Sequence, residues 1–297
     1  NFEQALIDLG YDDVLDDYVV TDSINSVTTL NVSNDSISDL TGIEDFTALT
    51  TLFCSNNALT ALDISSNTAL INFDCGYNSL TSLDVSSNTA LTGLGCYSNE
   101  LTSLDVSNNT ALIALQLQSN SLTSLDISSN IALDHLTVQN NQLTSLDVSN
   151  NTALIHLNIS DNNLDSLDVS TNTDLSFLSC AYNDLTVLDV SNNTALTRLD
   201  CYHNDLTNLD VTNNVNLTRL NTYGNALDTL DVSNNVDLTY LSCVGLQSSN
   251  LDVSNNIALS TLNCHTSQLT SLDVSNNTDL TYLNCRANQL DSLDVSN

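Results

Sequence analysis

The sequence predicts a β-rich solenoid in which each coil supplies two short parallel strands, with a small helical cap at the N-terminal end. Three observations predict this fold: a constant 21-residue period, an alternation of apolar and polar residues within each half of the period, and a first segment that departs from it. A constant period of this size means that each coil buries its apolar side only against neighbouring coils.

One copy of the repeat, residues 80–100, reads LTSLDVSSNTALTGLGCYSNE. Copies begin at Leu59 and at every 21st residue after it, and the last copy, residues 290–297, is expected to be incomplete. The two halves follow the patterns LxxLxVxxNxx and LxxLxCxxNx, and the alternation in each half is typical of a strand with one buried side. Because the coils stack in register, each half predicts one parallel sheet.

The first 23 residues break the period, and we expect them to cover the open end of the first coil. Apolar residues at helical spacing, followed by Gly10 as a helix stop, predict a short helix here: Phe2, Leu6, Ile7 and Leu9. Four acidic residues follow, which we expect to form a solvated turn, with a cation site as the alternative: Asp12, Asp13, Asp16 and Asp17.

The charge of the chain is strongly acidic, with 36 acidic residues against three Arg and no Lys and a net charge of −33. Nucleic acid is excluded as a partner, because its binding requires Lys and Arg to displace counterions. The sequence contains no apolar run of the length that crosses a membrane as a helix. The net charge is expected to favour solubility in a salty external medium.

One cysteine column and two asparagine columns are expected to be structural. All eight cysteines occupy the third apolar position of the second half-repeat, where Leu117, Val138 and Ile159 stand in other coils. This exchange predicts small, buried, free thiols. Asparagines at the ends of the half-repeats form two columns, one from Asn67 to Asn277 and the other from Asn57 to Asn225. A buried asparagine in a tight turn satisfies backbone groups of its own and the next coil.

An aspartate column runs along the first half-repeats from Asp63 to Asp294 and is expected to face solvent. The preferred interpretation is a solvated row, in which neighbouring Ser and Thr hydroxyls offset the repulsion between carboxylates. The alternative is a row of weak calcium sites along Asp84, Asp105, Asp126, Asp147, Asp168, Asp189 and Asp210. The sequence lacks the GGxGxD motif of calcium-bound β-rolls, and it implies no other cofactor.

The second half-repeat varies at its outward positions, and all four His, all three Arg and seven of the nine Tyr lie there. Tyr and Arg are enriched in binding hot spots, although exposed strands also favour aromatic residues. A weak metal site at His135 and His156 is a further alternative. The densest part of this face predicts the ligand-contacting residues Phe177, Tyr182, Arg198, Asp200, Tyr202, His203, Arg219, Asn221, Tyr223 and Tyr240.

The segment LTGLGCYSNEL, residues 91–101, matches the LxxLxLxxNxL pattern and resembles leucine-rich repeats, with Cys in the third apolar position. The doubled motif resembles the irregular tandem-motif subclass of secreted bacterial proteins. The stretch ISDLTGIEDFTALTTLFCSNNAL, residues 37–59, resembles the 22-residue internalin type. The resemblance implies a right-handed coil, internalin-like first repeats over residues 24–58, tandem repeats over residues 59–297, and an extracellular binding role without catalytic residues.

Catalysis is poorly supported, because GxSxG, HExxH, phosphate-loop and dinucleotide motifs are absent. The predicted function is an extracellular or cell-surface recognition or adhesion module of a bacterium, which binds a protein or a glycan through the variable Tyr/His/Arg face. The alternatives are a calcium-binding structural solenoid and a β-helical polysaccharide lyase, which would need Arg198 or Arg219 as its base.

Overall fold

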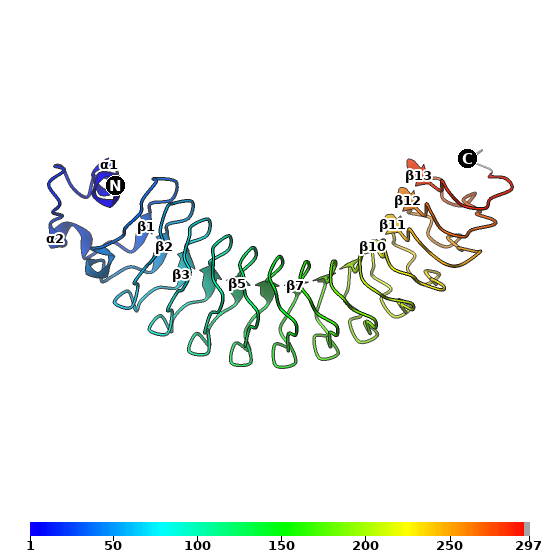
Figure 1. The fold of residues 1–297 in the computed structure, drawn as a ribbon, viewed down its shortest axis with the longest axis horizontal. Coiled ribbons are helices and arrows are strands. Elements are labelled where there is room, and N and C mark those ends of the chain that lie inside the picture. The colour runs from blue at the N-terminus through cyan, green and yellow to red at the C-terminus, as the bar shows by residue number, and fades with distance from the viewer. Residues whose placement is uncertain (294–297) are drawn as a thin grey trace. The chain divides into compact units, whose positions relative to one another are not determined.

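The computed structural model describes residues 1–293, so Asp294 and the rest of the incomplete last copy after residue 293 lie outside the described residues. The chain divides into two compact units, Asn1–Leu143 and Thr144–Asn297. In each unit, coils follow one another in chain order and every coil contributes one short strand to a parallel sheet (Figure 1).

The first unit contains two α-helices, one 3₁₀ helix and six strands: α1 (Phe2–Asp8), α2 (Thr21–Ile24), η1 (Ile43–Asp45), β1 (Thr29–Asn31), β2 (Thr51–Phe53), β3 (Asn72–Asp74), β4 (Gly93–Gly95), β5 (Ala114–Gln116) and β6 (His135–Thr137). The described part of the second unit contains seven strands: β7 (His156–Asn158), β8 (Phe177–Ser179), β9 (Arg198–Asp200), β10 (Arg219–Asn221), β11 (Tyr240–Ser242), β12 (Thr261–Asn263) and β13 (Tyr282–Asn284). The parallel solenoid predicted from the period is confirmed.

The strand register follows the repeat length. Thr29 of β1 pairs with Thr51 of β2, an offset of 51 − 29 = 22 residues. Thr51 pairs in turn with Asn72 of β3, an offset of 72 − 51 = 21 residues. The first coil is therefore one residue longer than those that follow, and its additional length lies in the part of the coil that contains η1.

The core is a column of apolar side chains contributed by both half-repeats. In the coil 80–100, six apolar side chains are at most 9% exposed: Leu80, Leu83, Val85, Leu91, Leu94 and Cys96. All eight cysteines are free thiols, and all except the half-buried Cys285 are buried. Burial raises the pKa of the Cys180 thiol to about 12, so this thiol stays protonated and unreactive at neutral pH.

The prediction of two strands per coil is wrong, because only the second half-repeat forms a strand within residues 1–293. In the first half-repeat, Asp84 Oδ1 accepts the backbone N–H of Ser86 at 2.9 Å. Asn88 N–H then bonds to the carbonyl oxygen of Val85 at 3.0 Å, which closes a tight turn. These local bonds use backbone groups that a second sheet would require. Short polar side chains commonly compete in this way with the hydrogen bonds between the strands of a sheet.

The two asparagine columns join successive coils, as predicted. Asn88 is fully buried, and its Nδ2 donates to the carbonyl oxygens of Ile64 and Asn67 at 3.0 and 2.9 Å. Asn99 Nδ2 donates to Cys75 O at 3.1 Å, while its Oδ1 accepts the N–H of Leu80 at 3.0 Å. Each asparagine thereby satisfies backbone groups in its own coil, in a neighbouring coil or in both.

The predicted N-terminal helix is present as α1, and Phe2 packs against Phe46 with ring centroids 6.2 Å apart. The helix covers the first coil through the buried Phe2 and Leu6, whereas Leu9 lies after the helix end and is 47% exposed. Gly10 follows in the left-handed region with φ 81°, as expected for a helix stop. Among residues 1–293, no helix is long and apolar enough to span a membrane.

Candidate ligand-binding face

The first outward position of each strand forms a row along the second unit. Residues 156, 177, 198, 219 and 240 occupy the same register position on β7 to β11, as the parallel pairing of these strands shows. In-register parallel strands place equivalent side chains next to one another on the same side of the sheet. We call this set the strand row: His156, Phe177, Arg198, Arg219 and Tyr240.

Side chains of the strand row stack on one another. The rings of His156 and Phe177 lie parallel, with centroids 4.1 Å apart and an interplanar angle of 5°. Arg198 Cζ lies 4.9 Å from the Phe177 ring centroid, and Arg219 Cζ lies 3.9 Å from the Tyr240 ring centroid. These distances are within the range of cation–π contacts. The row is therefore ordered by its own packing before any ligand is present.

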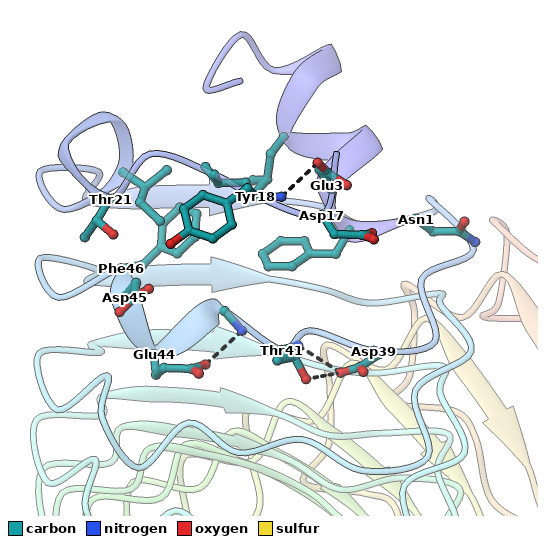
Figure 2. A pocket seen from close by; sticks show the side chains of 15 residues that line it. Asn1, Glu3, Asp17, Tyr18, Thr21, Asp39, Thr41, Glu44, Asp45 and Phe46 are labelled. Carbon is teal, nitrogen blue, oxygen red and sulfur yellow. Dashed lines mark hydrogen bonds between the residues drawn. The ribbon is translucent and has the colours of Figure 1, made fainter. Parts of the chain in front are cut away.

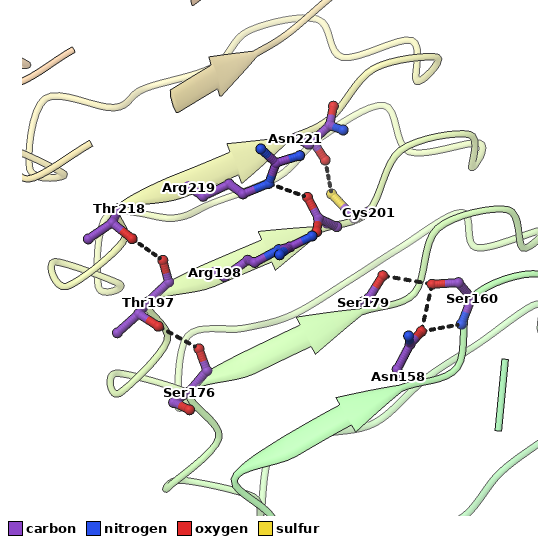
Figure 3. Close-up of polar contacts among 11 residues, drawn as sticks. Asn158, Ser160, Ser176, Ser179, Thr197, Arg198, Cys201, Thr218, Arg219 and Asn221 are labelled. Carbon is purple, nitrogen blue, oxygen red and sulfur yellow. Dashed lines mark hydrogen bonds and ion pairs between the residues drawn. The ribbon is translucent and has the colours of Figure 1, made fainter. Parts of the chain in front are cut away.

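Asp200, at the third position of β9, lies beneath the two arginines. Its side chain is only 3% exposed, and it receives Arg198 Nε at 2.6 Å on Oδ2 and Arg219 Nε at 3.2 Å on Oδ1. Figure 3 shows Arg198 and Arg219 reaching along adjacent strands. The geometry makes Asp200 a positioning residue for the arginines, while Asn221 is buried and holds the next turn through the N–H of Tyr223.

A second row of rings lies in the turns that follow the strands. Tyr182 stacks on His203 at 4.5 Å with an angle of 17°, and His203 meets Tyr223 edge to face at 4.6 Å. Tyr202 contacts Tyr182 at 5.3 Å. Gly224 makes room for this packing, because a Cβ at this position would lie 2.7 Å from His203 Nδ1. We call this set the turn row: Tyr182, Tyr202, His203 and Tyr223.

The two rows are close enough to interact electrostatically. The pKa of Tyr202 is raised, first by burial and then by the Asp200 carboxylate, and the charges of Arg219 and Arg198 partly oppose this rise. All ten residues predicted for the ligand site lie in the second unit, either in the strand row and the turn row or directly beneath them. Tyr182 and Tyr223 are 49% and 39% exposed and are open to a partner.

In the first unit, the strand face has a hollow that the sequence analysis missed. Its volume is about 150 Å³, and its lining includes Gly93, Gly95 and Ala114 at the outward positions of β4 and β5. The signal was present in the sequence, because these positions carry large or polar side chains in most other coils. Near this hollow, the Tyr97 hydroxyl donates to Asp74 Oδ2 at 3.1 Å.

The proposed histidine pair is divided between the units. His135 of β6 belongs to the first unit, and its Nδ1 lies 2.7 Å from Asp134 Oδ1. His156 of β7 belongs to the second unit and stacks on Phe177. Each ring therefore has a contact within its own unit, and the structure supplies no argument for a joint metal site.

A second hollow, of about 480 Å³, lies between the cap and the first coils (Figure 2). Its lining includes the apolar residues Phe2, Leu6 and Phe46 together with five carboxylates. Three of these accept backbone N–H groups. Asp39 accepts from Thr41 and Glu44 from Gly42 within local turns, while Glu3 accepts from Asp16 and Tyr18 and ties the segment after the helix to it. The carboxylates of Glu3, Asp39 and Glu44 therefore serve the chain's own backbone and need no ligand to account for them.

The aspartate column is exposed and regular. Asp189 Oδ1 accepts the Ser191 N–H at 2.9 Å, and the same contact recurs at Asp84, Asp105, Asp126, Asp147, Asp168 and, with Thr212, at Asp210. Hydrogen bonds from the hydroxyl and the N–H of Ser191 lower the pKa of the Asp189 carboxyl. Within residues 1–293, no group of three or more His, Cys, Asp and Glu side chains has the arrangement to hold a metal ion.

The comparisons with known proteins agree with this architecture. The functional domain of InlJ from Listeria monocytogenes, described as including a cysteine ladder, is 38% identical, with a TM-score of 0.82 and coverage of 93% of this chain and 67% of that chain. The chain belongs to the internalin family of leucine-rich-repeat proteins. The internalin InlF from the same species is 26% identical, with a TM-score of 0.90 and coverage of 98% of this chain and 89% of that chain.

Other comparisons are narrower. A segment of 51 residues is 43% identical to Internalin J of Listeria monocytogenes and covers 17% of this chain and 6% of that protein, so the chain matches a small part of this relative. A leucine-rich-repeat protein of Leptospira interrogans, 22% identical with a TM-score of 0.79 over 91% of this chain and 80% of that chain, shares the fold. No protein-family model matches the chain. The runs of cysteines at one core position of successive coils, such as Cys54, Cys75 and Cys96, are similar to the cysteine ladder described for InlJ.

Proposed function

We propose that this internalin-family chain is a recognition module that binds a protein ligand through the strand row and the turn row of its second unit. The observation that carries the proposal is the gathering of stacked Tyr, His, Phe and Arg side chains over β7 to β11, on a chain whose other half-repeats expose mainly Ser, Thr, Asn and Asp. Large aromatic side chains and Arg supply most of the energy in protein interfaces.

The order of these side chains supports binding. A partner that docks on stacked rings immobilises few additional rotamers, so the entropic cost of association is lower than for a face of free side chains. We also propose that the protein acts outside the bacterial cell, secreted or on its surface, as the resemblance to secreted repeat proteins implies. Fractionation of the producing bacterium tests the location.

The two alternatives have less support. A polysaccharide lyase needs a basic residue for proton abstraction, and here the chain has no Lys, while Arg198 and Arg219 both direct Nε to Asp200. A calcium solenoid would use the aspartate column, in which one carboxylate oxygen already accepts a backbone N–H. Neither alternative explains the aromatic rows.

The test is a binding screen against arrays of extracellular proteins and glycans, followed by variants of two tyrosines in equivalent turns. Tyr182 and Tyr77 have the same φ of 51° and are 49% and 59% exposed. We expect Tyr182→Ala to weaken binding of a protein ligand about tenfold, corresponding to ~1–2 kcal/mol. Tyr77→Ala in the first unit is the matched control and is expected to change affinity less than about twofold.

The proposal is wrong if a protein ligand binds the Tyr182→Ala/Tyr223→Ala variant as well as it binds the parent. Hits confined to the glycan array would assign the face to a different class of ligand. Both variants should remain folded, because substitutions of exposed side chains usually change the free energy of unfolding by about 0.5 kcal/mol or less.

A further inference from the structure

We propose that Arg198 and Arg219 form an anion subsite within this face, which takes an acidic side chain of the protein ligand. The identity of the ligand rests on the proposed function, whereas the subsite can be tested alone with a small carboxylate. It lies on β9 and β10, whose first residues are register partners.

The two guanidinium groups are held in place from one edge. Each donates through Nε to a different oxygen of Asp200, at 2.6 Å for Arg198 and 3.2 Å for Arg219. Among residues 1–293, the Nη atoms of these two arginines have no hydrogen-bonded protein acceptor. A guanidinium carries five N–H donors, so each arginine keeps four Nη–H donors for a ligand.

One face of each guanidinium group is also covered by a ring. Phe177 lies against Arg198 and Tyr240 lies against Arg219, at the opposite ends of the pair. The edges that carry the Nη atoms remain available to a ligand, because the side chains of Arg198 and Arg219 are 45% and 32% exposed. Bonds in the guanidinium plane are the geometry in which arginine binds carboxylates.

The local charge has the opposite sign to that of the chain. Among the outward first and third positions of β7 to β11, the charged side chains are Arg198, Arg219 and Asp200, which sum to +1 in a chain of −33. Asp200 alone would need one arginine for neutrality. The second arginine leaves an excess of positive charge that a carboxylate of the ligand would balance.

A purely structural pair is the competing explanation, in which both arginines serve only to neutralise the buried Asp200. The chain has only three arginines, so an NMR spectrum of the arginine Nε–Hε groups should contain separate signals for Arg198 and Arg219 and for an internal control, the exposed Arg286. Single variants Arg198→Lys and Arg219→Lys assign the signals.

The probe is the blocked dipeptide acetyl-Glu-Phe amide, which combines a carboxylate with a ring, and the control probe is acetyl-Gln-Phe amide. We expect the Glu peptide to shift the Arg198 and Arg219 signals saturably, and to leave Arg286 in place. The Gln peptide is expected to bind at least about tenfold more weakly, because it lacks the charge-assisted hydrogen bonds. Shifts of all three signals, or equal shifts with both peptides, would overturn the subsite.

Two variants separate a local site from the overall charge. Arg219→Gln should weaken binding of the Glu peptide about tenfold, while Arg286→Gln, which changes the net charge equally, should leave it within about twofold. Arg219→Gln removes one of the two partners of the buried Asp200 carboxylate and could therefore destabilise the fold. The triple variant Arg198→Gln/Asp200→Asn/Arg219→Gln leaves no charge in the site and provides the second test. Binding of the peptide to this folded triple variant would refute the subsite.

The outcome is independent of the ligand screen. Saturable binding of the Glu peptide supports the subsite even if no protein ligand is found. Weaker binding of a protein ligand to Tyr182→Ala supports the proposed binding face even if the Glu peptide does not bind. A third titration uses N-acetylneuraminic acid. If this sugar acid binds about tenfold or more tightly than the Glu peptide, the assignment to a protein side chain is wrong.

Discussion

Asn193 shows how single residues hold the coils together. It is fully buried, and its Nδ2 donates to the carbonyl oxygens of Val169 and Asn172 at 2.9 and 2.8 Å. Both acceptors belong to a neighbouring coil, and both would lose a partner if the amide were removed. The Asn193 Oδ1 atom has no hydrogen-bond partner within the described protein. The contribution of Asn193 to the stack therefore comes from the two hydrogen bonds that its amide group donates.

We expect Asn193→Ala to lower the free energy of unfolding by about 1–3 kcal/mol, because it removes two buried hydrogen bonds between coils. The carbonyl oxygens of Val169 and Asn172 then keep only their backbone donors, Asn172 N–H and Leu175 N–H. Asn193→Asp should cost more, since a buried carboxylate cannot donate and faces two carbonyl oxygens. Urea unfolding checks both values. The neighbouring Asn192→Ala is the control, because Asn192 is exposed, and an equal loss there would contradict the assignment.

At the scale of the element, the first half-repeat is a turn stabilised by aspartate. The hydroxyl and the N–H of Ser191 lower the pKa of the Asp189 carboxyl, although Asp168 and Asp210 act against this. Serine or threonine lowers the pKa of Asp84 and Asp210 in the same way. A folded-state pKa below the unfolded value means that the unfolded chain binds more protons on acidification, so stability rises with pH in this range.

The resulting stability is complete above the ordinary aspartate pKa of about 3.9 and is lost as pH falls through the lowered values of the folded state. We expect the urea midpoint to fall between about pH 4 and pH 2. The variant Asp168→Asn/Asp189→Asn/Asp210→Asn should be less sensitive to acid, because asparagine keeps the oxygen that accepts the N–H but does not titrate. A parent protein as stable at pH 2 as at pH 6 would contradict this account.

The sequence was sufficient to predict the repeat, the buried positions and the face that carries the rings, because each depends on periodicity alone. It was not sufficient to predict that Asp84 would replace a strand by a turn, since local hydrogen bonds compete with the ladder at similar energy. The burial of Asp200 was also missed. It depends on Arg198 and Arg219 from two different coils, which the single-coil pattern does not show.

At the scale of the whole molecule, charge is distributed unevenly. The chain carries −33, yet its three arginines lie at positions 198, 219 and 286, all in the second unit. The aspartates of neighbouring first half-repeats affect one another, since Asp84 raises the pKa of Asp63 in opposition to the hydrogen bonds that lower it. Repulsion of this kind acts between exposed groups and is reduced by salt.

We therefore expect sodium chloride to raise the melting temperature as its concentration rises from about 0.01 to 0.3 M, over which the Debye length falls from about 30 Å to less than 8 Å. Calcium chloride at the same ionic strength should give a similar rise, because one oxygen of each column carboxylate from Asp63 to Asp273 is already bonded to the backbone. The described residues also contain no cluster that could hold a metal. Differential scanning calorimetry with both salts measures the effect. A ligand that binds only the folded chain stabilises it by mass action, so a calcium-specific increase of many degrees would instead assign the aspartate column to cation binding.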